Sequence, residues 1–195
     1  MSERKIAIIG ASGVVGRALL ELLAGAGESV IGLSRREPAD LNATFVPLDL
    51  RDQDTCFDRA RSELADVTHL VYTALYEKPG LIAGWHEADQ METNLVMLRN
   101  ILEPLRQSSK LRHITLLQGT KAYGAHVEPM KIPGLEREPR HNHQNFYWLQ
   151  QDYLEDFCEA TGRTSTIWRP QIIFGHALHA PMNMLNAIGV YATIM

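Results

Sequence analysis

Short apolar runs and longer amphipathic segments alternate along this chain. Six runs of four to six residues have the length and composition of strands: Ile6–Ile9, Ser29–Leu33, Phe45–Leu48, Val67–Tyr72, His113–Leu117 and Thr164–Trp168. Four segments between them predict helices: Arg17–Leu23, Asp52–Ser62, Trp85–Gln107 and Asn145–Thr161. Because parallel strands need crossover connections, which helices usually supply, this alternation predicts an α/β fold with a doubly wound parallel sheet and helices on both faces.

A glycine-rich turn, Gly10-Ala11-Ser12-Gly13-Val14-Val15-Gly16, follows the first strand directly and precedes the first helix. In the dinucleotide-binding turn of a Rossmann fold, the first glycine permits the tight turn and the second lets the backbone approach a pyrophosphate. The third allows the helix to pack closely on the strand. The strand before the turn and the helix after it favour this interpretation over a merely structural turn. We therefore expect a dinucleotide to contact Gly10, Ser12, Gly13, Val14, Val15 and Gly16.

The end of the second strand predicts which dinucleotide binds. An NAD-specific protein places an acidic residue about twenty positions past the glycine turn, where this chain has Ser34-Arg35-Arg36. A 2′-phosphate requires hydrogen-bond donors and positive charge, and guanidinium groups supply both. The pattern therefore predicts NADPH, and two solvated surface arginines are the alternative.

Two further strand ends should complete the cofactor site, because ligands of open α/β sheets bind beyond the carboxyl ends of the strands. Asp49 and Leu50 follow the third strand and are expected near the adenine. Thr73 and Ala74 follow the fourth strand and are expected to line the cofactor crevice.

Composition excludes some classes of function. The 195 residues are 45% hydrophobic with a net charge of −4, so they can bury a large core and give no sign of binding nucleic acid or an anionic membrane surface. No apolar segment approaches the length of a membrane span, and the N-terminus leads into a strand rather than a signal-peptide segment. Cys56 and Cys158 form no C-x-x-C pair and are expected as free thiols, which predicts a cytoplasmic protein.

Two further segments carry candidate chemistry: Gln118-Gly119-Thr120-Lys121-Ala122-Tyr123-Gly124, and Asn145-Phe146-Tyr147-Trp148 followed by Gln151-Asp152. With the glycine turn and Ser34-Arg35-Arg36, they resemble the short-chain dehydrogenase/reductase superfamily. More narrowly, they resemble the progesterone 5β-reductase and iridoid synthase-like family, whose motifs are T-G-x-K-H-Y and N-F-Y-Y-x-x-E-D. The resemblance spans almost the whole chain. The sequence departs from it at four positions, where the family's Thr, His, Tyr and Glu are replaced by Gln118, Ala122, Trp148 and Gln151.

The resemblance implies that Tyr147 and Lys121 are the catalytic pair and that both also contact the cofactor. It implies NADPH-dependent reduction of the activated C=C bond of enones and enals, by hydride addition to the β-carbon. Negative charge then develops on the carbonyl oxygen, and a phenol donor aimed at that oxygen stabilises it. A neighbouring ammonium favours the charge that develops on the phenol.

The resemblance also extends to the end of the sixth strand. The stretch Arg169–Gly175 is similar to the family's R-P-x-x-I-F-G segment, which passes beside the nicotinamide, so it implies that Pro170, Ile172 and Ile173 contact the cofactor. Asn94 matches a family asparagine expected to face the catalytic centre, and a surface polar residue is the alternative.

The same residues leave other interpretations open. A sugar epimerase or dehydratase would have Tyr-x-x-x-Lys, with both side chains on one helical face, but position 151 is glutamine. A catalytically silent NADPH-binding sensor or scaffold would need no phenol. Tyr147 could instead belong to an aromatic packing cluster with Phe146 and Trp148, and Tyr123 is a rival phenol.

The histidines and the long connection after the fifth strand complete the candidate residues. The pairs His141/His143 and His176/His179 have no third ligand at helical spacing, so we expect no metal site. The segment 118–143 is rich in Pro, Gly and charge and is expected to be an active-site loop.

The organisation of the chain follows from these assignments. Residues 1–175 are expected to form the NADP-binding domain, and residues 176–195 to begin a C-terminal substrate-binding region that is truncated here. The apolar segment 181–195 is expected to be helical and to favour self-association. By analogy with the superfamily, the helices 85–107 and 145–161 are expected to form the interface of a homodimer.

Overall fold

Six parallel strands form one sheet in the computed structural model of the chain, which describes residues 4–78, 83–178 and 183–195. The strand order is β3-β2-β1-β4-β5-β6. The strands are β1 (Lys5–Ile9), β2 (Ser29–Ser34), β3 (Thr44–Pro47), β4 (His69–Tyr72), β5 (His113–Leu117) and β6 (Thr164–Trp168). The strand order reverses between β1 and β4, which is where open sheets of this kind bind their ligands.

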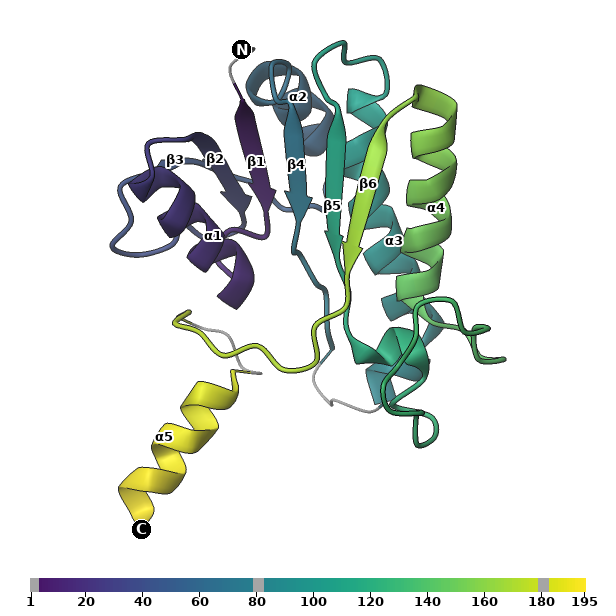
Figure 1. Cartoon of the computed structure of the whole chain (residues 1–195). Helices are drawn as coiled ribbons and strands as arrows, with labels where there is room; N and C mark the ends of the chain where they lie inside the picture. The colour runs from purple at the N-terminus through teal and green to yellow at the C-terminus, as the bar shows by residue number, and fades with distance from the viewer. Residues whose placement is uncertain (1–3, 79–82, 179–182) are drawn as a thin grey trace.

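Helices cover both faces of the sheet, as predicted (Figure 1). The helix α1 (Val14–Gly25) lies on one face. The other face carries α2 (Gln53–Glu63), α3 (Ala88–Leu102) and α4 (Phe146–Thr161). The doubly wound Rossmann architecture is therefore confirmed.

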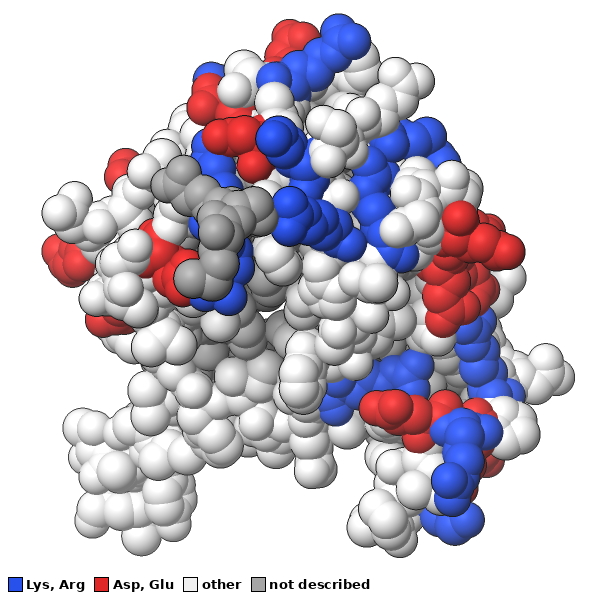
Figure 2. Space-filling model, turned by 45° about the horizontal axis from the view of Figure 1, so that its top comes forward, with Lys and Arg blue, Asp and Glu red and all other residues white. Residues whose placement is uncertain are grey.

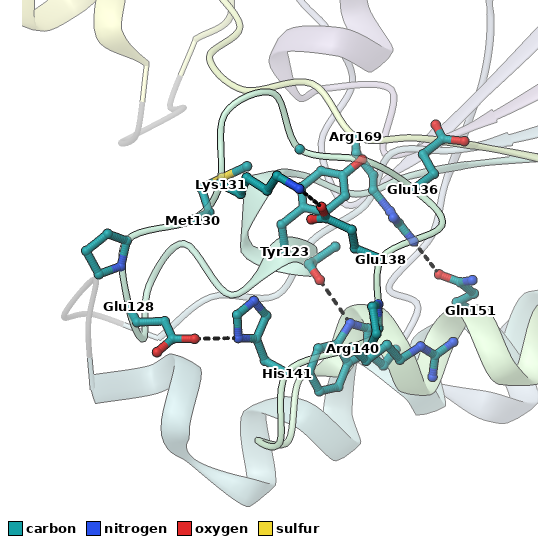
Figure 3. Close-up of a pocket in the computed structure, with 15 residues that line it drawn as sticks. Tyr123, Glu128, Met130, Lys131, Glu136, Glu138, Arg140, His141, Gln151 and Arg169 are labelled. Atoms are coloured by element: carbon teal, nitrogen blue, oxygen red, sulfur yellow. Dashed lines mark hydrogen bonds and ion pairs between the residues drawn. The ribbon is translucent and has the colours of Figure 1, made fainter.

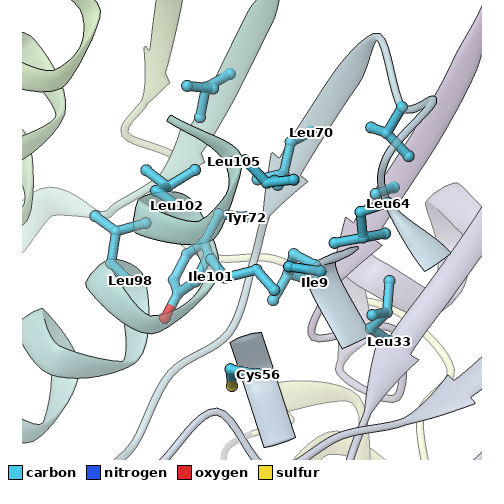
Figure 4. Close-up of a cluster of buried hydrophobic side chains, with 14 of the residues drawn as sticks. Ile9, Leu33, Cys56, Leu64, Leu70, Tyr72, Leu98, Ile101, Leu102 and Leu105 are labelled. Carbon is cyan, nitrogen blue, oxygen red and sulfur yellow. The ribbon is translucent and has the colours of Figure 1, made fainter. Parts of the chain in front are cut away.

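The main hydrophobic core lies between the sheet and the layer of α2, α3 and α4 (Figure 4). Its fully buried side chains include Leu33, Leu70, Tyr72, Leu98 and Ile101. A smaller cluster under α1 contains Ile6, Ile8, Ala11, Leu20 and Val30. Because β1 contributes to both clusters, the glycine turn that follows it starts from a strand buried on both sides.

The long helix predicted over residues 85–107 is wrong at both ends. Trp85 lies in a separate 3-10 turn, η1 (Ala83–His86), and α3 begins only after Glu87. After Leu102 the chain continues as a second 3-10 turn, η2 (Glu103–Leu105). Pro104 contributes to this end, because proline has no N–H with which to continue the helical hydrogen bonds.

The connection between β5 and α4 contains one short 3-10 turn, η3 (Thr120–Tyr123), and is otherwise free of helix and strand up to Asn145. The prediction of a long loop is confirmed. The predicted C-terminal helix is also present as α5 (Met184–Ile194), although Pro181 and Met182 lie outside the described residues.

The helix α5 differs from the others in its surroundings. It lies apart from the sheet in Figure 1, and it has no charged residue, so it appears white in the space-filling view at lower left (Figure 2). None of its residues is buried. The described helices include none that combines the length and the apolar character of a bilayer span.

Cys56 and Cys158 are both buried and form no disulfide, as predicted. Burial raises the pKa of the Cys56 thiol to about 12, so it stays protonated and unreactive at neutral pH.

Candidate functional site

The glycine turn has two positions where only glycine fits. Gly10 has a φ of +91°, and its N–H donates to the Leu33 carbonyl at 2.8 Å. A Cβ on Gly10 would lie 2.7 Å from the Ala74 nitrogen. A Cβ on Gly16 would overlap the Gly10 carbonyl oxygen and lie 2.8 Å from the carbonyl carbon. The third glycine therefore allows the close contact between β1 and α1 that the sequence predicts, and the first allows a tight turn against the segment after β4.

The middle of the turn is open by contrast. Gly13 is the N-cap of α1, and a Cβ there would meet only the Gly10 oxygen, at 3.4 Å. Ser12 precedes it, and Val14 and Val15 begin the helix. Because Gly13 has no side chain, a ligand can approach the backbone and the first N–H groups of α1 closely at this position. This arrangement fits the pyrophosphate of a dinucleotide.

The ends of β2 and β3 bring charged groups to the same edge of the sheet. Ser34 is buried and its hydroxyl donates to the Arg36 carbonyl at 2.7 Å, while Arg35 and Arg36 are exposed. Asp49 accepts two hydrogen bonds from the Arg51 guanidinium, at 3.0 and 2.6 Å, which hold the pKa of that carboxyl below its usual range.

Buried contacts fix the neighbouring strand ends. Leu50 is buried, and its carbonyl accepts a hydrogen bond from the Asn100 amide at 2.8 Å. The Thr73 hydroxyl donates to the Ile9 carbonyl at 2.9 Å, next to Gly10. Thr73 and Ala74 therefore adjoin the glycine turn, where the sequence places them.

The segment after β6 passes close to the start of α1. A Cβ on Gly175 would lie 2.8 Å from the Val14 side chain, so this segment packs against the first turn of the helix. Pro170 and Ile173 line a cavity of about 470 Å³ between the two. The cavity also contacts Val15, Leu117, Tyr123, Glu136, Ile167, Trp168 and Arg169. Ile172 is absent from this lining and is more than half exposed.

Lys121 and Tyr147 meet at one indole ring. The Lys121 Nζ lies 3.7 Å from the centre of the Trp85 ring, which is a cation–π contact. The Tyr147 ring packs edge-on against the same indole at 5.3 Å and against Phe146 at 4.6 Å. Both residues of the predicted catalytic pair therefore contact one indole. Tyr147 is at the same time part of an aromatic packing cluster with Trp85 and Phe146.

The phenol points toward the ends of β5 and β6. A Cβ on Gly119 would lie 3.4 Å from the Tyr147 hydroxyl and 3.5 Å from the Pro170 carbonyl. Burial raises the pKa of Tyr147, and the carboxylate of Glu77 raises it further. At neutral pH the phenol is therefore a proton donor beside the cavity that Pro170 lines.

Three hydrogen bonds hold the start of α4 against the end of β5. The Asn145 side chain caps α4 by accepting from the Tyr147 N–H at 2.9 Å, and its amide donates to the Lys121 carbonyl at 2.6 Å. The Trp148 indole donates to the Ala122 carbonyl at 3.1 Å. These bonds fix η3 and α4 together, and with them the two candidate catalytic residues.

Two of the departures from the family motifs are linked through Arg169. Gln118 donates to the Tyr147 carbonyl at 2.8 Å and accepts from Arg169 Nε at 3.0 Å. Arg169 Nη2 donates to Gln151 Oε1 at 2.7 Å (Figure 3). Two neutral amides therefore accept from this guanidinium, which also lies 5.0 Å from the centre of the Tyr123 ring.

Asn94 is buried, so the alternative of a surface polar residue is wrong. Asn94 is fully buried, and its amide accepts from the Tyr76 N–H and donates to the Tyr76 and Gln90 carbonyls, all within 2.9 Å. It therefore fixes the backbone after β4, at the residue before Glu77. Every polar atom of its side chain is used for this purpose.

Two residues of this site, Glu77 and Trp85, were not identified from the sequence. Glu77 Oε1 accepts from the Trp85 indole at 2.7 Å and lies 4.0 Å from Lys121 Nζ. The segment 73–87 has no helical or strand period, so its side chains give no directional signal. The available sequence signal for this pair was an acidic residue, Glu77, eight positions before a tryptophan, Trp85, in such a segment.

The histidines of the loop gather beside Trp85 without forming a metal centre. His126 Nε2 lies 3.2 Å from His143 Nε2, and His141 Nδ1 lies 2.9 Å from a Glu128 oxygen. In the part of the chain that the structure describes, no three His, Cys, Asp or Glu side chains converge as metal ligands do. His179 lies outside that part.

The loop also lines the cavity of about 490 Å³ shown in Figure 3. Its walls carry Tyr123, Met130, Trp148 and several paired charges, including Lys131 with Glu138. Neither Lys121 nor Tyr147 contributes to it. Tyr123, the rival phenol, contributes to this cavity and to the one beside Pro170.

Comparison with known proteins adds relatives to this geometry. The chain is 33% identical over 206 residues to a 3-oxo-Delta(4,5)-steroid 5-beta-reductase of Arabidopsis thaliana, and 32% identical over 204 residues to an (S)-8-oxocitronellyl enol synthase of Camptotheca acuminata. Both alignments cover 96% of this chain and 50% of the relative. The chain therefore spans about half the length of the curated relatives it matches.

Solved structures share the fold. A putative epimerase from Burkholderia cenocepacia superposes with a TM-score of 0.72 at 21% identity, covering 97% of this chain and 61% of that one. The Bordetella bronchiseptica enzyme WbmH in complex with NAD+ superposes with a TM-score of 0.70 at 21% identity, over 97% and 63%. The model of the NAD dependent epimerase/dehydratase family matches residues 6–188. By this match, and with a glycine turn and strand order that agree with it, the chain belongs to the NAD dependent epimerase/dehydratase family.

Proposed function

We propose that this chain is the cofactor-binding half of an NADPH-dependent reductase of the activated C=C bond of enones and enals. The observation that supports it most is the meeting of Lys121 and Tyr147 on Trp85, with the Tyr147 hydroxyl directed at Gly119 near the Pro170 carbonyl. The named relatives, a steroid 5-beta-reductase and enol synthases, agree with this choice.

The proposed cofactor contacts all lie at the carboxyl edge of the sheet. The amides of α1 and the backbone of Gly13 would hold the pyrophosphate, and Arg35 and Arg36 the 2′-phosphate. Asp49, Leu50, Thr73 and Ala74 would line the adenine side of the crevice, and Pro170, Ile172 and Ile173 the nicotinamide side. Bound NADPH would supply the hydride for the β-carbon.

Tyr147 and Lys121 would act on the substrate oxygen. The phenol donates a hydrogen bond to the carbonyl oxygen, where negative charge develops as the β-carbon is reduced. The raised pKa of Tyr147 keeps its proton in place until that charge appears. The Lys121 ammonium favours the charge that passes to the phenol and is the expected donor to the nicotinamide ribose.

The substrate side of the site is also a proposal. Residues 1–175 would form the NADP-binding domain and residues 176–195 the beginning of a substrate-binding region. A homodimer through α3 and α4 stays a prediction, and their outward faces carry charged residues such as Glu92, Arg99, Glu155 and Asp156. The exposed apolar side chains gather instead on α5, at Leu185, Ile188, Val190, Tyr191 and Ile194.

NADPH consumption with small enones and enals, such as 2-cyclohexenone and trans-2-hexenal, tests the proposal. We expect NADPH to be preferred over NADH, and Tyr147→Phe to lower kcat by about 100-fold to 1,000-fold, the usual loss of one oxyanion donor. Tyr123→Phe, which removes the rival phenol, is the matched control. Saturable NADPH binding without turnover would favour the silent cofactor-binding alternative, and no binding would refute the cofactor site.

A further inference from the structure

Glu77 is an acidic residue inside the aromatic cluster, five positions after the end of β4. Its side chain is only 14% exposed. The Oε1 atom accepts a hydrogen bond from the Trp85 indole at 2.7 Å. The same atom lies 4.0 Å from Lys121 Nζ, which sits above the Trp85 ring at 3.7 Å. One carboxylate oxygen therefore contacts both the indole N–H of Trp85 and the Lys121 ammonium that lies above the ring.

The charge balance around Lys121 depends on this carboxylate. Within residues 4–78, 83–178 and 183–195, Glu77 is the only carboxylate within 4 Å of the Lys121 ammonium. Among the other titratable groups, Tyr147 packs on the same indole and His126 feels the charge of Lys121, and neither supplies negative charge. His86 and His143 pack against His126. Burial lowers the pKa of Lys121, and Glu77 opposes that shift.

We infer that Glu77 is a positioning residue, which holds the Trp85 ring in place and keeps Lys121 protonated over that ring, which Tyr147 also contacts. The catalytic meaning of this role rests on the proposed reductase function. The same carboxylate disfavours ionisation of Tyr147, because two negative charges would then share one largely buried cluster. Glu77 thereby keeps both groups in the protonated form that stabilisation of an oxyanion requires.

The substitution Glu77→Gln separates charge from shape, because the amide oxygen can still accept the Trp85 hydrogen bond. The pH midpoint of Lys121 is measured directly, from the rate at which trinitrobenzenesulfonate modifies it, followed by mass spectrometry of the peptide. We expect the midpoint to fall by about 1 to 3 pH units in Glu77→Gln, the usual effect of removing an opposite charge at this distance. Glu159→Gln, on the exposed end of α4, is the matched control and should leave the midpoint unchanged.

An unchanged Lys121 midpoint in Glu77→Gln would overturn the inference. Glu77→Asp serves as a second variant, since it retains a carboxylate and should keep the midpoint nearer to wild type than Gln does, even where Glu77→Gln is too unstable to titrate. An equal fall in both variants would also refute a role for charge.

The labelling result and the enzyme result are independent. With an active wild type, the alkaline limb of kcat/KM for the enone should move to lower pH in Glu77→Gln by the same amount as the Lys121 midpoint. A shifted midpoint in a chain that reduces no enone would refute the proposed function and leave the role of Glu77 toward Lys121 intact. Enone reduction by the wild type, with no shift of the Lys121 midpoint in Glu77→Gln, would support the proposed function and refute the role of Glu77.

Discussion

Gly16 is the position where a single methyl group should do most damage to the fold. It lies buried in the first turn of α1, and a Cβ there would overlap the Gly10 carbonyl oxygen. The nearby backbone atoms, the Gly10 carbonyl carbon at 2.8 Å and the Ala11 Cα at 2.9 Å, belong to the turn itself. No rotation of a side chain can relieve the overlap, so Gly16→Ala must move α1 away from β1.

The size of the effect follows from two opposing terms. Adding a methylene to a well-packed site costs about 1 to 3 kcal/mol. Replacing glycine by alanine within a helix contributes about 0.5 to 1 kcal/mol in the stabilising direction. Gly25, at the other end of α1, has no atom within 4 Å of its ideal Cβ, so only the second term applies there. The second term is common to both variants, so we expect Gly16→Ala to be less stable than Gly25→Ala by about 1 to 3 kcal/mol, the cost of the overlap alone.

Urea unfolding followed by circular dichroism measures the difference, and thermal unfolding should show it as several degrees in Tm. NADPH affinity should fall in Gly16→Ala, because the α1 amides move relative to the turn, and should be unchanged in Gly25→Ala. Equal stabilities for the two variants, within about 0.5 kcal/mol, would show that the turn yields easily and that close packing does not explain the third glycine.

Three further results are expected. Asn145→Ala should lower the free energy of unfolding by about 2 kcal/mol, because it removes the cap on the Tyr147 N–H and the donor to the Lys121 carbonyl, whereas Asn145→Asp keeps the cap and should lose less. His126 has its pKa lowered to about 4, mainly by burial, so between pH 6.5 and 4 the unfolded chain binds a proton that the folded chain does not. From pH 7 to pH 5 the wild type should therefore lose about 1 kcal/mol more stability than His126→Asn, after allowance for solvent screening, and parallel curves would contradict this. Ile188→Glu, on the exposed α5, should weaken concentration-dependent association in sedimentation velocity, and unchanged association would exclude α5 as its cause.

The parts of this molecule that the sequence predicts are those set by local rules. Gly10 and Gly16 are readable because a positive φ and a close backbone contact leave no other residue type suitable. The start of α4 is readable from Asn145, which caps it. The end of α3 could also have been read from Pro104, but the apolar period continuing to Leu105 concealed it.

The remainder depends on contacts between distant segments. Glu77, Lys121 and Tyr147 come from three segments with no common period. Trp85, which lies in η1, contacts all three. The sequence resemblance supplied the Lys121 and Tyr147 pair, but nothing in it indicated the carboxylate beside them. Asn94 illustrates the converse: its match to a family position was visible, while its role in fixing the Tyr76 backbone was not.

The contacts of Arg169 explain why the ammonium of this site comes from η3 rather than from α4. In the Tyr-x-x-x-Lys arrangement the lysine would occupy position 151, one turn after Tyr147. Here the side chain of Gln151 accepts from Arg169 Nη2 at 2.7 Å (Figure 3), and an ammonium at that place would meet a guanidinium of like charge. Lys121 instead arrives from the end of β5, where the bond from Asn145 to its carbonyl fixes it beside the start of α4. The charges of Arg169 and Glu77 therefore account for both positions. Arg169 disfavours a cation at position 151 on α4, and Glu77 stabilises the ammonium of Lys121 on η3.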